Sequence, residues 1–274
     1  MRIPPSLELF IRSIIGRAYP RVIGANRELS WLIPETVLPL LGLAAYVYVY
    51  RAMKAPTEFV GYVVLGGAMT AYWLNILWSM ASQFYWEKET ANLQLYIMAP
   101  VSPMAILLGM GIGGLVASTI RAGAVIIVGS LLFGVTYQVS SLGLILLVFF
   151  LSMVALYGMG MLLASLFLLS GREAYNLSNA LQEPVYLFSG FYFPVKSLGF
   201  WAAAVASIIP LTLGLDAMRQ LMFPGDPTLG FLSPWVECGI LLLLCPIFIY
   251  LSKVALKKME RAARIKGTLS LRWQ

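Results

Sequence analysis

Long stretches of this chain carry apolar side chains and no charged ones. Residues 59–86 form one such stretch, and residues 122–171 form another. A helix of about 20 apolar residues is long enough to cross the hydrocarbon core of a bilayer, which is roughly 30 Å thick. The pattern therefore predicts an all-α membrane protein whose chain crosses the bilayer several times.

Six segments are expected to span the membrane, and they cover residues 31–50, 59–84, 104–134, 142–169, 174–194 and 234–251. A further apolar stretch at residues 200–209 is too short to cross, so we expect a short re-entrant outer segment between the fifth and sixth spans. Residues 1–274 are interpreted as a single transmembrane domain. Its parts are a cytoplasmic or interfacial helix (1–28), the six-span region (29–252) and a basic cytoplasmic tail (253–274).

The residues before the first predicted span have the periodicity of an amphipathic helix. One face carries Leu7, Phe10, Ile11, Ile14 and Ile15, and the other carries Glu8, Arg12 and Arg17. Such a helix is typical of segments that lie in the membrane interface, with basic side chains directed toward anionic lipid headgroups. The alternative is that its apolar face packs against protein, but no soluble domain is evident that would offer a surface.

Composition agrees with these elements and excludes several functions. Hydrophobic residues make up 60% of the chain and charged residues only 11%, whereas soluble domains are about a quarter charged. The chain has no histidine, which removes the commonest general base and metal ligand. Cys238 and Cys245 lie on one helical face and cannot bridge each other, so we expect neither a disulfide nor a metal site.

The net charge of +7 reflects basic residues that gather at the two ends of the chain. An even number of spans puts both termini on one side, and the segments on that side then hold most of the Lys and Arg residues. This distribution is typical of cytoplasmic segments. We therefore expect a multi-pass protein of the inner or plasma membrane, with both termini in the cytoplasm and no nucleic-acid partner.

A segment that is first polar and then apolar follows the second predicted span. A charged triplet marks its start, three apolar residues follow at helical spacing, and prolines end it. These residues are Glu87, Lys88 and Glu89, then Leu93, Tyr96 and Ile97, then Pro100 and Pro103. The pattern predicts a short cytoplasmic helix, which either lies at the surface as a loop or docks into a groove of a partner.

The region from the fifth span to residue 224 is rich in proline, glycine and charge. Pro184, within that span, leaves a backbone carbonyl that another group or water must satisfy at membrane depth. Prolines and glycines then indicate a chain that turns back near the outer surface. The residues that mark this outer motif are Gly190, Phe193, Pro194, Pro210, Asp216 and Arg219.

Two charged side chains are expected deep in the bilayer. Arg121 lies near the middle of the third predicted span, and Glu183 lies near the middle of the fifth. An unpaired charge at the bilayer centre costs at least about 2.5–3.5 kcal/mol, so each needs a partner or water. We expect the two to pair with each other. The alternative is that Glu183 lines a pathway and meets a cationic substrate.

The third predicted span also contains a face of small residues. Gly109 and Gly113 form a Gly-x-x-x-Gly pattern, which allows helices to approach closely. Such a face would fit a contact between two copies of the chain.

Two of these segments resemble the diagnostic motifs of the permease subunits of type-two ABC exporters, which have six spans per chain. Residues 87–102 look like that family's acidic loop and coupling helix, with Gly109 where its glycine-lysine pair follows. Residues 189–194, 210–212 and 216–219 look like its second signature, which precedes the sixth span. Both motifs occur in order and at matching places, so the resemblance covers nearly the whole chain.

The resemblance implies a permease subunit whose ATP chemistry belongs to another chain. No Gly-x-x-x-x-Gly-Lys-Ser/Thr motif occurs, so this chain lacks a phosphate-binding loop and is not expected to be an enzyme or to hold a cofactor. The implied complex contains two copies of an ABC ATPase subunit, which bind ATP and Mg. It also contains a second permease chain, which we expect to be identical, and it sits among membrane lipids.

Alternating access in such a complex would move a hydrophobic or amphipathic substrate out of the cytoplasm or inner leaflet. A drug, a lipid or a lipid-linked glycan fits this description. An ion- or proton-coupled secondary transporter is the alternative, because Glu183 and Pro184 resemble the midplane carboxylates on broken helices of that class. A membrane enzyme is a third class, but no convergent acid, base and nucleophile are visible.

Overall fold

The computed structural model describes residues 5–27, 29–83, 86–87, 90, 96, 99, 101–170, 173–224 and 230–266. Within these residues the chain forms helices joined by turns and loops, and it forms no strand. The predicted all-α fold is therefore confirmed.

The helices and their bounds are, in chain order, α1 (Pro5–Arg27), α2 (Leu29–Ala52), α3 (Glu58–Leu74), the π-helix η1 (Asn75–Ala81), α6 (Pro103–Phe133), α7 (Leu142–Ser170), α8 (Glu173–Phe188), the 3-10 helix η2 (Val195–Leu198), α9 (Phe200–Ala206), α10 (Pro210–Met222) and α11 (Pro234–Lys266). Local sequence sets several of these ends. Proline occupies the first position of α6 and of α10, where its missing N–H costs nothing. Gly134 ends α6 with φ 70°, a conformation that glycine adopts without strain.

Four of the described helical segments are long and apolar enough to cross a membrane: Glu58–Ala81, Pro103–Phe133, Leu142–Phe167 and Pro234–Met259. Helices α9 and α10 are bent by 114° at a short break and together add a broken span or a re-entrant loop. Helices α2 and α8 lie where the first and fifth spans were predicted, but neither is among these four segments, so a six-span count stays a prediction. Their apolar helical parts are shorter, however, since α8 has 16 residues and the apolar part of α2 is Thr36–Ala52. The chain is thus a multi-pass membrane protein.

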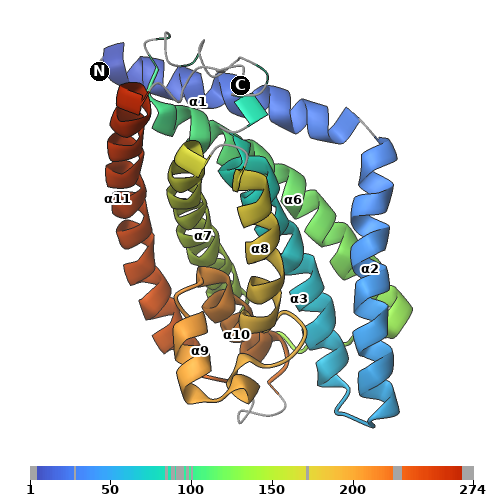
Figure 1. The fold of residues 1–274 in the computed structure, drawn as a ribbon. Coiled ribbons are helices and arrows are strands. Elements are labelled where there is room, and N and C mark those ends of the chain that lie inside the picture. The colour runs from blue at the N-terminus through green and yellow to red at the C-terminus, as the bar shows by residue number, and fades with distance from the viewer. Residues whose placement is uncertain are drawn as a thin grey trace.

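The long helices run side by side as a bundle with two different ends (Figure 1). At one end, which we call the α1 end, α1 lies across the bundle beside the C-terminal end of α11. At the other, the α9 end, α9 and α10 fold back between α8 and α11. Within the bundle α7 packs most extensively against α11, and α3 packs against α6. The first helix and the C-terminal end of the last helix therefore meet at the same end of the bundle.

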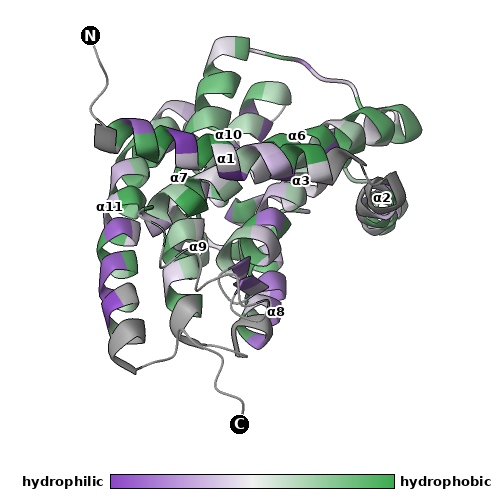
Figure 2. Cartoon of the chain, turned by 90° about the horizontal axis from the view of Figure 1, so that it is seen from above, coloured by the Kyte–Doolittle hydropathy of each residue, from purple (hydrophilic) through white to green (hydrophobic). Residues whose placement is uncertain are grey.

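Helix α1 packs on the bundle and still presents an apolar surface. Its main partner is α6, which it crosses at the α1 end (Figure 2). Leu7, Ile15 and Tyr19 point away from that contact and are 47%, 59% and 67% exposed. One side of α1 thus packs against protein, as the alternative interpretation of the amphipathic pattern expects, and a place for the exposed side in the membrane interface stays a prediction.

Glycines of α6 allow the close approach of α1. A Cβ atom at Gly109 would lie 2.6 Å from the carbonyl oxygen of Ile14, and one at Gly113 would lie 3.0 Å from that of Ala18. The Gly-x-x-x-Gly face is therefore occupied by a helix of the same chain. The expectation that it forms a contact between two copies was wrong, because α1 already covers it.

Replacing Gly109 with alanine should displace α1 from α6. The new Cβ would meet backbone, which cannot rotate away, so thermal stability should fall and α1 should become accessible to protease. The matched control is Gly123→Ala in the same helix, where nothing lies within 4 Å of the new Cβ. That change should be neutral or should stabilise by up to about 1 kcal/mol, through helix propensity. Equal melting temperatures for the two variants would contradict the packing.

Candidate functional site

The predicted coupling segment is described at only a few positions. Glu87 and Tyr96 are among them, whereas Lys88, Glu89, Leu93, Ile97 and Pro100 lie outside the described residues. Glu87 is 5% exposed and forms an ion pair with Arg17 of α1. Its Oε1 also accepts a hydrogen bond from Gln83 Nε2 at 2.7 Å. Glu87 therefore faces α1 and is not a free surface acid.

Arg17 links three parts of the α1 end. Its guanidinium pairs with Glu87 and lies 5.4 Å from the centre of the Tyr96 ring. Burial raises the pKa of Tyr96. Nearby, Arg21 Nη1 donates to Gln83 Oε1 at 3.4 Å, and burial together with the charge of Arg17 lowers the pKa of Arg21. The expectation that Arg17 points toward lipid headgroups was wrong, because a buried carboxylate needs a cationic partner more than the membrane surface does.

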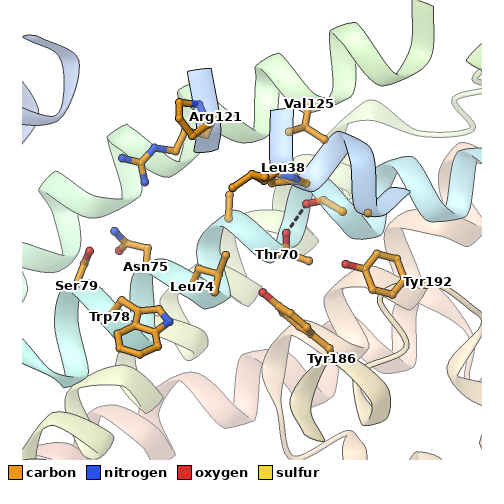
Figure 3. A pocket seen from close by; sticks show the side chains of 15 residues that line it. Leu38, Thr70, Leu74, Asn75, Trp78, Ser79, Arg121, Val125, Tyr186 and Tyr192 are labelled. Atoms are coloured by element: carbon orange, nitrogen blue, oxygen red, sulfur yellow. Dashed lines mark hydrogen bonds between the residues drawn. The ribbon is translucent and has the colours of Figure 1, made fainter. Parts of the chain in front are cut away.

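A cavity of about 440 Å³ opens between α2 and the neighbouring helices of the bundle. Helices α2, α3, α6 and α8 line it together with η1 and the loop after α8. Its residues are Pro34, Leu38, Pro39, Gly42, Gly67, Thr70, Ala71, Leu74, Asn75, Trp78, Ser79, Arg121, Val125, Tyr186 and Tyr192. Figure 3 shows Arg121 extending from α6 on the side of Asn75 and Ser79, with Tyr186 and Tyr192 across the cavity. The lining combines apolar and aromatic surface with hydroxyl, amide and guanidinium groups.

The π-helix η1 brings several polar side chains to this cavity. Asn75, its first residue, accepts a hydrogen bond at Oδ1 from the Tyr157 hydroxyl at 3.2 Å. Trp78 Nε1 donates to Gln182 Oε1 of α8 at 3.0 Å. A Cβ at Gly114 would lie 2.3 Å from Asn75 Oδ1, so α6 must present a glycine there. Single π-turns inside longer helices are frequent at functional sites, and the sequence offers no periodic signal that would have located this one.

The two predicted intramembrane charges lie on helices that both border the cavity. Arg121 lines it from α6. Glu183 is exposed on α8 and accepts a hydrogen bond from the Gln182 amide at 3.4 Å. A direct Arg121–Glu183 pair stays a prediction, and so does contact of Glu183 with a cationic substrate.

The outer motif converges on one buried cation, Arg219 of α10, which is 2% exposed. Its Nη1 donates to the carbonyl oxygens of Gly190 at 2.6 Å and Phe193 at 3.1 Å. Its Nη2 donates to those of Phe191 at 2.7 Å and Tyr62 at 2.9 Å. The guanidinium thus fastens the loop after α8 to α3 and α10. We call this set of contacts the Arg219 clamp.

Aromatic contacts extend the Arg219 clamp to α2 and to the cavity. The Tyr50 hydroxyl donates to the carbonyl oxygen of Tyr192 at 2.9 Å, and the Tyr46 and Tyr192 rings stack with centroids 4.2 Å apart. Of the other predicted residues, Pro194 precedes η2 and Pro210 begins α10. Because Tyr192 also lines the cavity, the loop that Arg219 holds forms part of the cavity wall.

A multi-pass helical bundle with an amphipathic cavity, a folded-back segment at one end and a helix lying across the other is the architecture of a membrane permease. The sequence model of the ABC-2 type transporter family matches residues 23–223, which is well over half of the chain. The chain therefore belongs to the ABC-2 type transporter family, and it is a permease component that is not itself catalytic. A comparison with curated proteins finds no match. The family resemblance of the two sequence motifs is confirmed.

Replacing Arg219 with alanine should unfold the α9 end at lower temperature than in the wild type. Four buried carbonyl groups would lose their donor, so we expect a cost of at least about 3 kcal/mol. Arg219→Lys should recover little of it, because an ammonium cannot reach four acceptors as a planar guanidinium does. Arg51→Ala is the matched control, since Arg51 is exposed and donates to the single carbonyl of Phe133 at 2.8 Å. If thermal melts in detergent show the same loss of melting temperature for Arg51→Ala and Arg219→Ala, the stabilising role of the Arg219 clamp is contradicted.

Proposed function

We propose that this chain is the membrane subunit of an ATP-driven exporter that moves a hydrophobic or amphipathic substrate by alternating access. Two such chains would form the membrane part, each with six spans in which α2 and α8 serve as the first and fifth. Two ABC ATPase subunits, carrying ATP and Mg, would bind at the cytoplasmic side. The central cavity is the observation that carries the proposal, and membership of the ABC-2 family supports it.

The cavity matches an amphipathic cargo. Ligand sites are mostly apolar and contain a few placed polar groups that orient the ligand. Here Leu38, Leu74 and the tyrosine rings offer apolar surface, while Arg121 and Asn75 offer donors on one side. A lipid, a drug or a lipid-linked glycan has both kinds of surface. Its release away from the cytoplasm or inner leaflet follows from the proposed orientation, with the α1 end inside the cell.

Coupling would run through the α1 end. Closure of the ATPase subunits on ATP would displace the segment from Glu87 to Pro100, and only ligands that bind one state more tightly can drive such a change. The Glu87–Arg17 pair would pass this displacement to α1. Helix α1 would pass it to α6, which lines the cavity and which it contacts closely at Gly109.

Breaking the Glu87–Arg17 pair should uncouple ATP hydrolysis from substrate. In the complex with the ABC ATPase encoded beside this chain, Glu87→Ala and Arg17→Ala should each lower substrate-stimulated ATPase activity several-fold. The double variant should be no worse than either single one, because all three lose the same interaction. Matched controls are Glu8→Ala and Arg12→Ala, which break an exposed pair on the same helix worth about 0.3–0.5 kcal/mol.

Two outcomes of this experiment would count against the proposal in different ways. If no ATPase co-purifies with the wild-type chain, the exporter function is wrong and a secondary transporter becomes the better candidate. If the ATPase binds and Glu87→Ala retains full coupling, the exporter stands, but the route through α1 is wrong.

Filling the cavity should block substrate binding and leave the fold intact. Gly42 lines the cavity, and no atom lies within 4 Å of a Cβ placed there, so Gly42→Phe adds a ring to open space. We expect loss of binding of a fluorescent acyl-labelled phospholipid, with stability changed by less than about 1 kcal/mol. Gly143→Phe, at an equally open glycine away from the cavity, is the control. Unchanged binding in Gly42→Phe would place the substrate elsewhere.

A further inference from the structure

A buried polar junction joins α10 to α11 at the α9 end, and the proposed transport cycle makes no use of it. Asp216 of α10 accepts hydrogen bonds at Oδ2 from Gln220 Nε2 at 2.9 Å and from the backbone N–H of Phe231 at 2.8 Å. The Gln220 amide also donates to the carbonyl oxygen of Leu232 at 2.7 Å. Asp216 thereby holds the turn that leads into α11.

Glu237, in the first turn of α11, brings a second carboxyl group to the same junction. Its side chain is 0% exposed, and neither carboxyl oxygen makes a hydrogen bond of ordinary geometry among the described residues, although the backbone of Leu232 lies near it. The carboxyl of Asp216, which is 3% exposed, lies beside it. Buried polar atoms nearly always have a partner, so a carboxylate in this position would be an exception.

The surrounding charges cannot balance two carboxylates. Arg219 follows Asp216 by one helical turn and is the cation beside it. Helix α7, which packs most extensively against α11, has no charged side chain over its whole length. Helix α6 touches α11 less, and its charged residue, Arg121, lines the central cavity. With Arg219 opposite Asp216, an ionised Glu237 would leave one uncompensated negative charge in a buried position.

We infer that Asp216 and Glu237 bind one shared proton, with Glu237 as a neutral carboxylic acid whose O–H donates to the Asp216 carboxylate. This arrangement gives Glu237 a partner and keeps the junction neutral. Loss of the proton would place two carboxylates side by side and force α11 away from α10. Because α10 also carries the Arg219 clamp, the proton stabilises the packing of α10 against α11 and, through α10, the rest of the α9 end.

Infrared spectroscopy of the purified full chain tests the proton directly. At neutral pH the wild type should show the carbonyl absorption of a protonated carboxyl group, and Glu237→Gln should lack it. Glu58→Gln is the matched control, because Glu58 also begins a helix at the α9 end and is only partly buried. The absorption should persist in that variant. If it is absent from the wild type, or unchanged in Glu237→Gln, the inference is overturned.

The dependence of stability on pH gives a second, independent readout. The unfolded chain can ionise Glu237 while the folded chain keeps its proton, so wild-type stability should fall as the pH rises from acid to alkaline. Glu237→Gln should lose most of this fall, melting several degrees above the wild type at alkaline pH and close to it at acid pH. A variant whose stability differs from that of the wild type by the same amount at every pH would show that folding binds no proton at Glu237, which contradicts a shared proton.

Two further measurements apply if Glu237→Gln does not fold, or if a metal cation occupies the junction instead of a proton. If Glu237→Gln does not fold, Asp216→Asn takes its place, since an amide can donate to an ionised Glu237 and should abolish the protonated-carboxyl absorption. Sodium or potassium that stabilises the wild type, but not Glu237→Gln, would identify a metal cation in place of the proton. None of these readouts uses the ATPase, so their failure is separate from failure of the exporter proposal.

Discussion

The α9 end of this protein depends on one buried guanidinium group whose two terminal nitrogens both donate hydrogen bonds. Arg219 uses both terminal nitrogens to bind three backbone carbonyls of the loop after α8 and one of α3, and buried carbonyl groups of this kind need a donor. The loop can approach only because α3 has a glycine there. A Cβ at Gly66 would lie 1.5 Å from the carbonyl oxygen of Phe191. One charged residue on α10 and one missing side chain on α3 thus decide how the chain turns back.

The α1 end also depends on a buried charged group, but there the buried group is an anion and its partner is a cation. There the buried group is a carboxylate, Glu87, and the cation comes from a helix that crosses the bundle. Between these two tightly bonded ends lies the cavity, bordered by a π-helix whose side chains make contacts such as Asn75–Tyr157. In the proposed transport cycle, the bonded ends would transmit a displacement while the cavity between them would hold the cargo.

The sequence predicted some of these features and missed others. Hydrophobic runs predicted α6, α7 and α11, and the motif residues predicted that something specific happens near Asp216 and Arg219. The sequence did not reveal that Arg17 pairs with Glu87 or that Gly109 contacts the backbone of α1. Helical periodicity assigns a side chain to a face of its own helix, but it cannot say what lies opposite that face. Glu237 carried no signal for the same reason, because its place near the start of a predicted span does not show that its side chain is fully buried.

Composition and charge-free runs by themselves determined that the chain is a helical membrane protein, because continuous apolar runs of this length satisfy their own backbone in lipid as helices. Two motifs in order determined the family. The tertiary structure alone decided which charges are buried together, which glycines admit a neighbouring backbone, and where the cavity opens. Those outcomes depend on contacts between residues far apart in the sequence, such as Arg219 and Tyr62, which are 157 positions apart. Their energies come from desolvation and close packing, which exist only once distant helices have met.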